Sequence, residues 1–161
     1  MLLKNPPVVE KISVRYADLD PYGHVSNAVY LSFFESVRIA YLRALSKNLG
    51  LGPLEAGDLP GVRYAIAEAT VRCKDPVYLD NLLYGAASVR SVGWHSFIID
   101  YELRTGASFD EGRVVAEGTT AQVFYAPKTR GIRRSPEWFL ATVAPLKGRT
   151  EESFAPKVKV G

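Results

Sequence analysis

The chain has 161 residues, of which 47% are apolar and 23% charged, and its formal net charge is +3. These values are typical of one soluble globular domain, and they exclude two domains of ordinary size, a disordered chain and a fibrous chain. No apolar run reaches the roughly 18 residues that cross a bilayer, and residues 1–7 lack the apolar core of a signal peptide. We therefore expect a cytoplasmic location.

Cysteine usage limits the covalent and metal chemistry. Cys73 is the only cysteine, which excludes an intramolecular disulfide and a cysteine-based zinc site within one chain. We expect Cys73 to be a small buried apolar residue. Asp and His can also ligate zinc or iron, but only one of the two histidines lies near the acidic residues described below, so no metal site is expected.

The first predicted element is a strand at residues 11–16. Ile12, Val14 and Tyr16 alternate there with polar side chains, and this period of two predicts a strand with one buried face. We expect these three side chains to lie on that face.

A long helix follows. Apolar residues recur every three to four positions after Asn27, which predicts a helix of about five turns that buries a broad face. Ser26 or Asn27 can cap its start, and Gly50 can close its end. Glu35 and Arg38 stand three positions apart and are expected to pair on the helix surface.

The rest of the chain predicts mainly strands. Short turns separate four extended runs, so an antiparallel meander is expected, because parallel pairing needs longer crossovers. A short helix is predicted at residues 135–143 and a flexible tail at 147–161. Together with the long helix, this gives a single α+β domain at residues 1–146, with about five antiparallel strands. The four runs are Val62–Cys73, Leu83–Val92, Phe97–Leu103 and Val114–Tyr125.

A dense polar segment precedes the long helix. Asp18, Asp20, His24 and Asn27 fall within ten residues at the predicted helix start. The positive end of the helix dipole and its unpaired N–H groups favour developing negative charge. A carboxylate beside such donors can attack a carbonyl or deprotonate a water. Taken singly, these residues are better explained by structure, with Asp18 and Asp20 as turn formers and His24 packed against the helix start, and only the cluster indicates a site.

A basic segment lies near the end of the domain. Four cations fall within seven residues without an acidic neighbour. They can neutralise the phosphates of a nucleic acid or of a phosphorylated cofactor, although a solvated loop is as good an explanation. The segment lacks interleaved aromatic residues, so nucleic acid is not expected to bind. The four are Lys128, Arg130, Arg133 and Arg134.

Residues 16–42, YADLDPYGHVSNAVYLSFFESVRIAYL, resemble the signature of hot-dog-fold thioesterases of the 4-hydroxybenzoyl-CoA thioesterase type. They are also similar to the Asp-Leu-Asp…His-Val-Asn-Asn motif of plant acyl-carrier-protein thioesterases. The resemblance implies a hot-dog fold over residues 10–145, in which an antiparallel sheet wraps a long central helix. It also implies an acyl-CoA thioesterase that produces a free acid and CoA without a cofactor.

The same resemblance assigns catalytic roles. Asp20 matches the family's catalytic carboxylate, which acts either as a nucleophile on the thioester carbon or as the base for a water. Asn27 matches the position whose backbone N–H polarises the thioester oxygen, and His24 matches a histidine that orients or assists the carboxylate or the water. Tyr22 stands where the plant enzymes have an asparagine, so the residue that assists their mechanism is absent at this position.

The resemblance also bears on CoA binding and assembly. Family members carry basic residues just before a serine that starts a strand, whereas this chain has only His95 before Ser96. A serine there is also commonly a local hydrogen-bonding group. We therefore expect the CoA phosphates to be held by His95, Ser96 and the four cations of the basic segment. The family's active sites lie at a dimer interface where two sheets join edge to edge, which implies a homodimer or homotetramer.

Two other functions remain open from the sequence. Hydratases and dehydratases of the same fold also use Asp and His on acyl thioesters, and an acyl-CoA-binding module without activity would keep the same pocket. The sequence does not choose the acyl group or decide between a CoA and an acyl-carrier-protein thioester.

Overall fold

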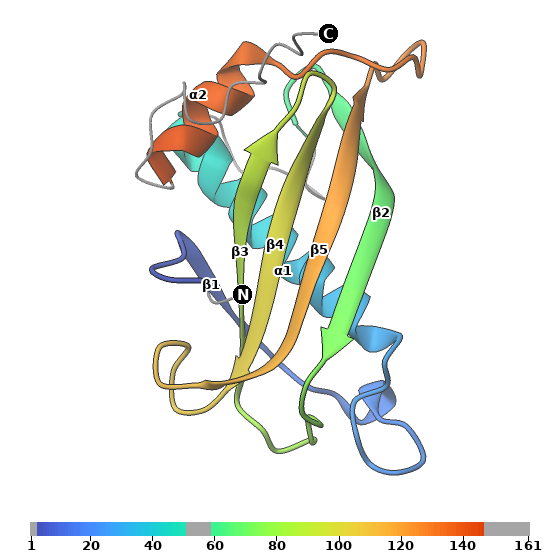
Figure 1. The fold of residues 1–161 in the computed structure, drawn as a ribbon, viewed down its shortest axis with the longest axis vertical. Helices are drawn as coiled ribbons and strands as arrows, with labels where there is room; N and C mark the ends of the chain where they lie inside the picture. Colours follow the sequence, from blue (N-terminus) through green and yellow to red (C-terminus); the bar gives the residue numbers. More distant parts are fainter. Residues whose placement is uncertain (1–2, 51–58, 147–161) are drawn as a thin grey trace, which may run out of the picture.

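The computed structural model describes residues 3–50 and 59–146, so the predicted tail at 147–161 lies outside the described residues. The elements follow one another along the chain as drawn in Figure 1. They are β1 (Val8–Ile12), the 3₁₀ turn η1 (Tyr16–Asp18), α1 (Val29–Asn48), β2 (Arg63–Cys73), β3 (Leu83–Val92), β4 (Ser96–Thr105), β5 (Arg113–Tyr125) and α2 (Glu137–Leu146).

The five strands form one antiparallel sheet in the order β1-β3-β4-β5-β2. The successive strands β3, β4 and β5 form the expected meander. The expectation is wrong for β2, which pairs with β5 at the sheet edge, with Arg63 opposite Tyr125 and Cys73 opposite Ala116. Residues 74–82 carry the chain from this edge to β3, and they are long enough to pass over the end of the sheet without forming a hairpin.

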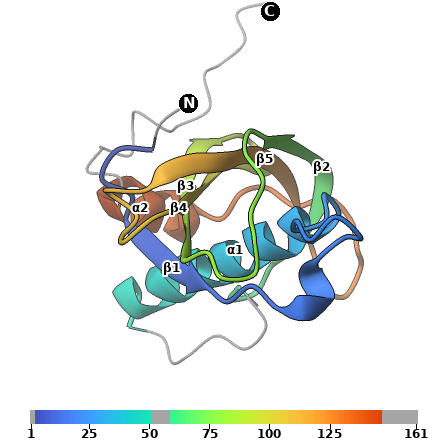
Figure 2. The ribbon, with the colours of Figure 1, turned by 90° about the horizontal axis from the view of Figure 1, so that it is seen from below.

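The helix α1 lies across one face of the curved sheet, as Figure 2 shows from below. Phe34 of α1 stacks on Tyr101 of β4, with ring centroids 4.7 Å apart and an interplanar angle of 15°. Gly118 of β5 leaves room for this ring, because a Cβ atom there would overlap Phe34 Cε2. The predicted α+β hot-dog arrangement, with a long helix held in an antiparallel sheet, is confirmed.

Gly118 makes the close packing of helix on sheet testable. Gly118→Ala is expected to lower the free energy of unfolding by about 1–3 kcal/mol, because the added methyl must displace a fully buried ring. The matched control is Gly131→Ala, where the nearest atom would be 3.7 Å from the new Cβ. Denaturant unfolding of the two variants measures the difference, and equal stabilities would contradict this packing.

The start of the domain differs from expectation at two places. β1 ends at Ile12, and the chain then enters η1, so that Tyr16 is 82% exposed and does not lie on a buried strand face. The helix starts at Val29, and neither Ser26 nor Asn27 caps it through a side chain. Instead, the Val29 N–H donates to the backbone oxygen of Ser26 at 2.9 Å. The expected glycine at the helix end is confirmed, since Gly50 has a φ of 69°.

Arg38 is buried, with an exposed fraction of 5%, and the expected surface pair with Glu35 is wrong. Its Nε donates to the Tyr64 hydroxyl at 3.3 Å and its Nη1 to the Tyr101 hydroxyl at 3.4 Å. The residue lies on the sheet-facing side of α1, where phenol oxygens replace water as hydrogen-bond acceptors.

Charged side chains also lie buried on the other face of the sheet. Asp100 is 3% exposed and accepts bonds from Arg90 Nε at 2.9 Å, from Arg90 Nη2 and from the Thr119 hydroxyl. Glu102 is fully buried and is paired with Arg104. Apolar and polar side chains alternate along β4, and the acids on its polar side are paired with arginines and buried from solvent.

Candidate functional site

Asp20 and His24 are brought together by a tight turn between η1 and α1. The Asp20 N–H donates to the His24 backbone oxygen at 2.7 Å, and Leu19 and Val25 form an isolated antiparallel bridge just outside it. Gly23 has a φ of +81°, a conformation that side-chain-bearing residues rarely adopt, and its N–H donates to the Asp20 backbone oxygen at 3.0 Å. The glycine therefore allows the chain to close back on Asp20.

The Asp20 carboxylate is half-buried and has two different oxygens. Oδ1 accepts the N–H groups of Tyr22 at 2.9 Å and His24 at 3.2 Å, which fixes the orientation of the side chain. Oδ2 accepts no hydrogen bond from any residue in the described part of the chain. One oxygen is thus held by the turn, while the other has no donor among the described residues.

The His24 ring is held by an aromatic neighbour. It meets the Tyr78 ring edge to face, with centroids 5.0 Å apart and an interplanar angle of 87°. The Val25 N–H donates to the Val77 backbone oxygen at 2.8 Å, which fixes residues 74–82 against the turn. Sequence reasoning missed Tyr78, since no spacing rule links residue 24 to the connection between β2 and β3.

Asn27 lies just before α1 and is exposed. Neither its backbone N–H nor that of Ala28 donates to an acceptor in the part of the chain that the structure describes. Both are available donors at the positive end of the helix. The Asn27 side-chain oxygen is 3.7 Å from Cys73 Sγ. Cys73 is exposed at the end of edge strand β2, so the expected burial is wrong, although partial desolvation raises the pKa of its thiol.

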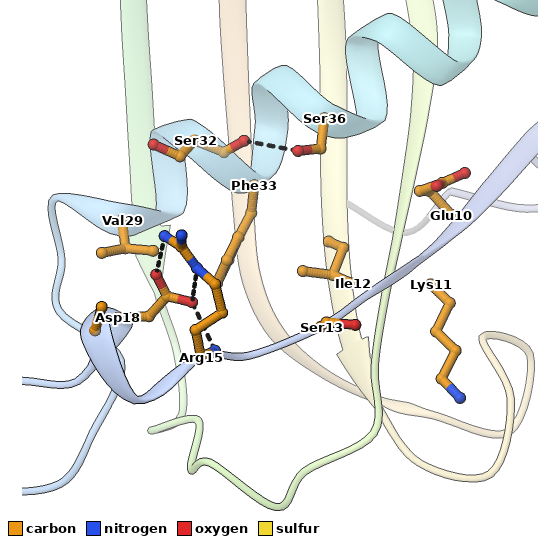
Figure 3. Close-up of a pocket in the computed structure, with 11 residues that line it drawn as sticks. Glu10, Lys11, Ile12, Ser13, Arg15, Asp18, Val29, Ser32, Phe33 and Ser36 are labelled. Atoms are coloured by element: carbon orange, nitrogen blue, oxygen red, sulfur yellow. Dashed lines mark hydrogen bonds and ion pairs between the residues drawn. The ribbon is translucent and has the colours of Figure 1, made fainter.

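Asp18 is only 2% exposed. Its carboxylate accepts the backbone N–H of Arg15 at 2.8 Å and Arg15 Nη2 at 2.9 Å (Figure 3). A cavity of about 380 Å³ lies beside this pair, between β1 and the first turns of α1, and Ile12, Ser32 and Phe33 are among its lining residues. Asp20, His24 and Asn27 do not line this cavity.

The Asp18 pKa predicts how stability depends on pH. Burial alone would raise the pKa of this carboxyl, but the hydrogen bonds and charge of Arg15 outweigh burial and lower it. A lowered folded-state pKa adds stability that is complete above the ordinary aspartate value of about 4 and is lost as the pH falls through the lower value. We therefore expect Asp18→Asn to reduce the loss of unfolding free energy between about pH 4 and pH 2. Urea unfolding across that range checks this, and identical slopes for both proteins would contradict it.

The six residues predicted to bind CoA lie at the turn between β3 and β4 and in the segment between β5 and α2, which Figure 1 shows at the end of the sheet opposite η1. The His95 backbone oxygen accepts the Phe124 N–H at 2.8 Å, which anchors the turn between β3 and β4 to β5. The Arg134 guanidinium lies 4.2 Å above the Trp94 ring centroid. Within this group are His95, Ser96, Lys128, Arg130, Arg133 and Arg134.

Some of these cations contact other parts of the domain and others do not. Arg133 Nη1 donates to the Gly61 backbone oxygen at 2.6 Å and so ties the basic segment to the start of β2. Lys128 and Arg130 are exposed, and no described residue forms an ion pair with them. The residues predicted to be catalytic and those predicted to bind CoA thus lie at opposite ends of β2 in one chain, a strand of 11 residues or about 33 Å.

Neither a membrane-spanning helix nor a metal-binding cluster is present among the described residues. None of the described helices combines the length and apolarity needed to cross a membrane. Among residues 3–50 and 59–146, no three His, Cys, Asp or Glu side chains are grouped to hold a metal ion.

Solved structures of other proteins share this fold. A thioesterase from Thermus thermophilus, solved with coenzyme A and Zn, aligns at 24% identity with a TM-score of 0.73, covering 92% of this chain and 99% of that one. A 1,4-dihydroxy-2-naphthoyl-CoA thioesterase from Synechocystis aligns at 18% identity with a TM-score of 0.68, covering 86% and 96%. A probable thioesterase from Escherichia coli aligns at 23% identity with a TM-score of 0.62, covering 78% and 88%.

Sequence comparison identifies the family. No curated protein matches the chain in sequence. Residues 14–143, however, match the family model of the thioesterase-like superfamily. This range includes the turn with Asp20, the whole of α1 and all the strands except β1. The protein therefore belongs to the thioesterase-like superfamily and is a thioester hydrolase with the hot-dog fold.

Proposed function

We propose that the protein hydrolyses acyl-CoA to a free acid and CoA, with Asp20 as its catalytic carboxylate. One observation carries the proposal: Asp20 has an open oxygen in a turn that leads directly into α1, where the N–H groups of Asn27 and Ala28 have no acceptor among the described residues. Thioester cleavage needs a nucleophile or base and unpaired donors that stabilise the oxyanion, and this segment supplies both kinds of group. The CoA-bound relative supports the choice of the carrier.

The chemistry divides between two groups. The N–H groups at the start of α1 stabilise the negative charge that develops on the thioester oxygen. Asp20 Oδ2 either attacks the thioester carbon, releasing CoA thiolate and leaving an anhydride for water to cleave, or takes a proton from a water that attacks the same carbon. We propose that His24, whose ring is held against Tyr78, orients that water. Acyl-CoA and water are the only reactants required.

The CoA phosphates are proposed to bind the basic segment of a second chain. β2 is an edge strand on which most residues are exposed, including Ala65 and Ile66. An edge of this length without a neighbour is a liability that proteins usually cover. We therefore propose a homodimer in which two copies of β2 pair edge to edge; a homotetramer would be a dimer of such pairs.

This pairing explains why the two groups lie apart in one chain. Two identical strands that pair antiparallel about a two-fold axis place the Arg63 end of each beside the Cys73 end of the other. Asn27 contacts the Cys73 end, and the basic segment is tied to Gly61 near the Arg63 end. Each proposed site would then combine Asp20 of one protomer with the basic segment of its partner.

Product analysis separates the proposed function from its alternatives. The purified protein is incubated with saturated, aromatic and 2-enoyl-CoA substrates, and free acid, CoA and hydrated acyl-CoA are quantified. Equal amounts of acid and CoA support hydrolysis. Hydration of enoyl-CoA with the thioester intact would indicate a hydratase, and binding without any product would indicate a binding module.

A further inference from the structure

Hydrogen bonds between Arg15 and Asp18 form a closed ring that spans the η1 turn, just before the candidate catalytic residues. Arg15 Nη2 reaches Asp18 Oδ1 at 2.9 Å, and the backbone N–H of Arg15 reaches Oδ2 at 2.8 Å (Figure 3). Arg15 Nε is 3.5 Å from the same Oδ2. The guanidinium side chain is 74% exposed, whereas the carboxylate side chain is 2% exposed. An acid that already accepts these donors is not open to attack a substrate.

The main chain of Asp18 is connected to both halves of the proposed site. Its backbone oxygen accepts the Ser26 N–H at 2.8 Å. The next residue, Leu19, forms the bridge that closes the Asp20 turn. Ser26 in turn accepts the first N–H of α1, that of Val29, at 2.9 Å. A movement of Asp18 would therefore shift the carboxylate of the turn and the donors at the helix start relative to each other.

We propose that Arg15 and Asp18 are positioning residues for thioester hydrolysis, acting by holding Asp20 and the start of α1 in their relative places. The inference rests on the function proposed above. It assigns neither residue a contact with the substrate. Small displacements of reacting groups are costly, since misplacement by about 1 Å can slow an enzyme on the order of 10²-fold. Loss of this ring of hydrogen bonds is therefore expected to lower kcat.

The test compares Asp18→Asn with Asp100→Asn. Asp100 is an equally buried acid paired with an exposed arginine, but it lies on the other face of the sheet. Asp18→Asn is expected to lower kcat about tenfold or more while KM stays within about threefold. Asp100→Asn is expected to leave kcat within about twofold. Arg15→Gln, at a more exposed position, is expected to change kcat in the same direction with the fold intact.

Amide hydrogen exchange gives a second readout that needs no substrate. The Asp20 and Ser26 amides are expected to exchange about tenfold faster in Asp18→Asn than in the wild type, and at wild-type rates in Asp100→Asn. Unchanged kcat in Asp18→Asn, or equal losses in both variants, would overturn the proposal while leaving the proposed hydrolysis intact. If the wild type hydrolyses no acyl-CoA, the proposed function fails, and unchanged exchange at Asp20 and Ser26 then overturns the positioning role as well.

Discussion

Asp20→Ala is expected to lower kcat for acyl-CoA hydrolysis on the order of 10²-fold or more, with little change in the free energy of unfolding. The side chain is half-buried, and its Oδ1 accepts only the two N–H groups of its own turn. The substitution therefore removes the nucleophile or base of the reaction but does not remove any packing contact of the hydrophobic core. Steady-state release of CoA thiol at saturating substrate measures the change.

Two controls separate a chemical role from a disturbed turn. Asp20→Asn keeps an oxygen that can accept the same N–H groups but removes the charge, so it should be as inactive as Asp20→Ala. Asp110→Ala removes an exposed carboxylate from the loop between β4 and β5 and should leave the rate unchanged. An active Asp20→Asn would show that the turn, and not the carboxylate, matters.

Two inactive variants are expected to restore activity when mixed. One carries Asp20→Ala and the other replaces the cations of the basic segment, Lys128, Arg130, Arg133 and Arg134, by glutamate. In a two-fold dimer with shared sites, a mixed pair holds one site with both groups intact. Random exchange of equal amounts makes half of the dimers mixed, so about a quarter of the wild-type sites return.

The recovery depends on which chain supplies the cations. If each site draws Asp20 and the basic segment from a single chain, every site in the mixture lacks one group and the activity remains at the level of the separate variants. The exchange is checked by tagging one variant and recovering mixed dimers through the tag. A monomeric mass for the wild type would contradict the shared site directly.

Much of the fold could be predicted from the sequence because the signals are local. The helix period after Asn27 and the four extended runs reflect residues a few positions apart, and all of these elements are present. The position of β2 could not be predicted, since strand pairing is decided by contacts between distant segments. The exposure of Cys73 follows from the same cause, because β2 is an edge strand.

The same division applies to the candidate site. Asp20, His24 and Asn27 lie within eight positions of the sequence, so the sequence alone predicts that they are close together in the structure. The sequence does not predict the contact of His24 with Tyr78, because this contact depends on how the connection between β2 and β3 passes the turn. The burial of Arg38 is not predictable for another reason: a charged residue is expected at the surface, whereas two phenol oxygens in the interior accept its hydrogen bonds.

The proposed role of Asp20 in acyl-CoA hydrolysis is tested most directly by the release of CoA thiol from a panel of acyl-CoAs, measured side by side for the wild type and Asp20→Ala. We predict turnover of at least one acyl-CoA by the wild type, with a loss on the order of 10²-fold or more in the variant. Equal rates for the two proteins, or no release from any acyl-CoA by the wild type, would contradict the claim.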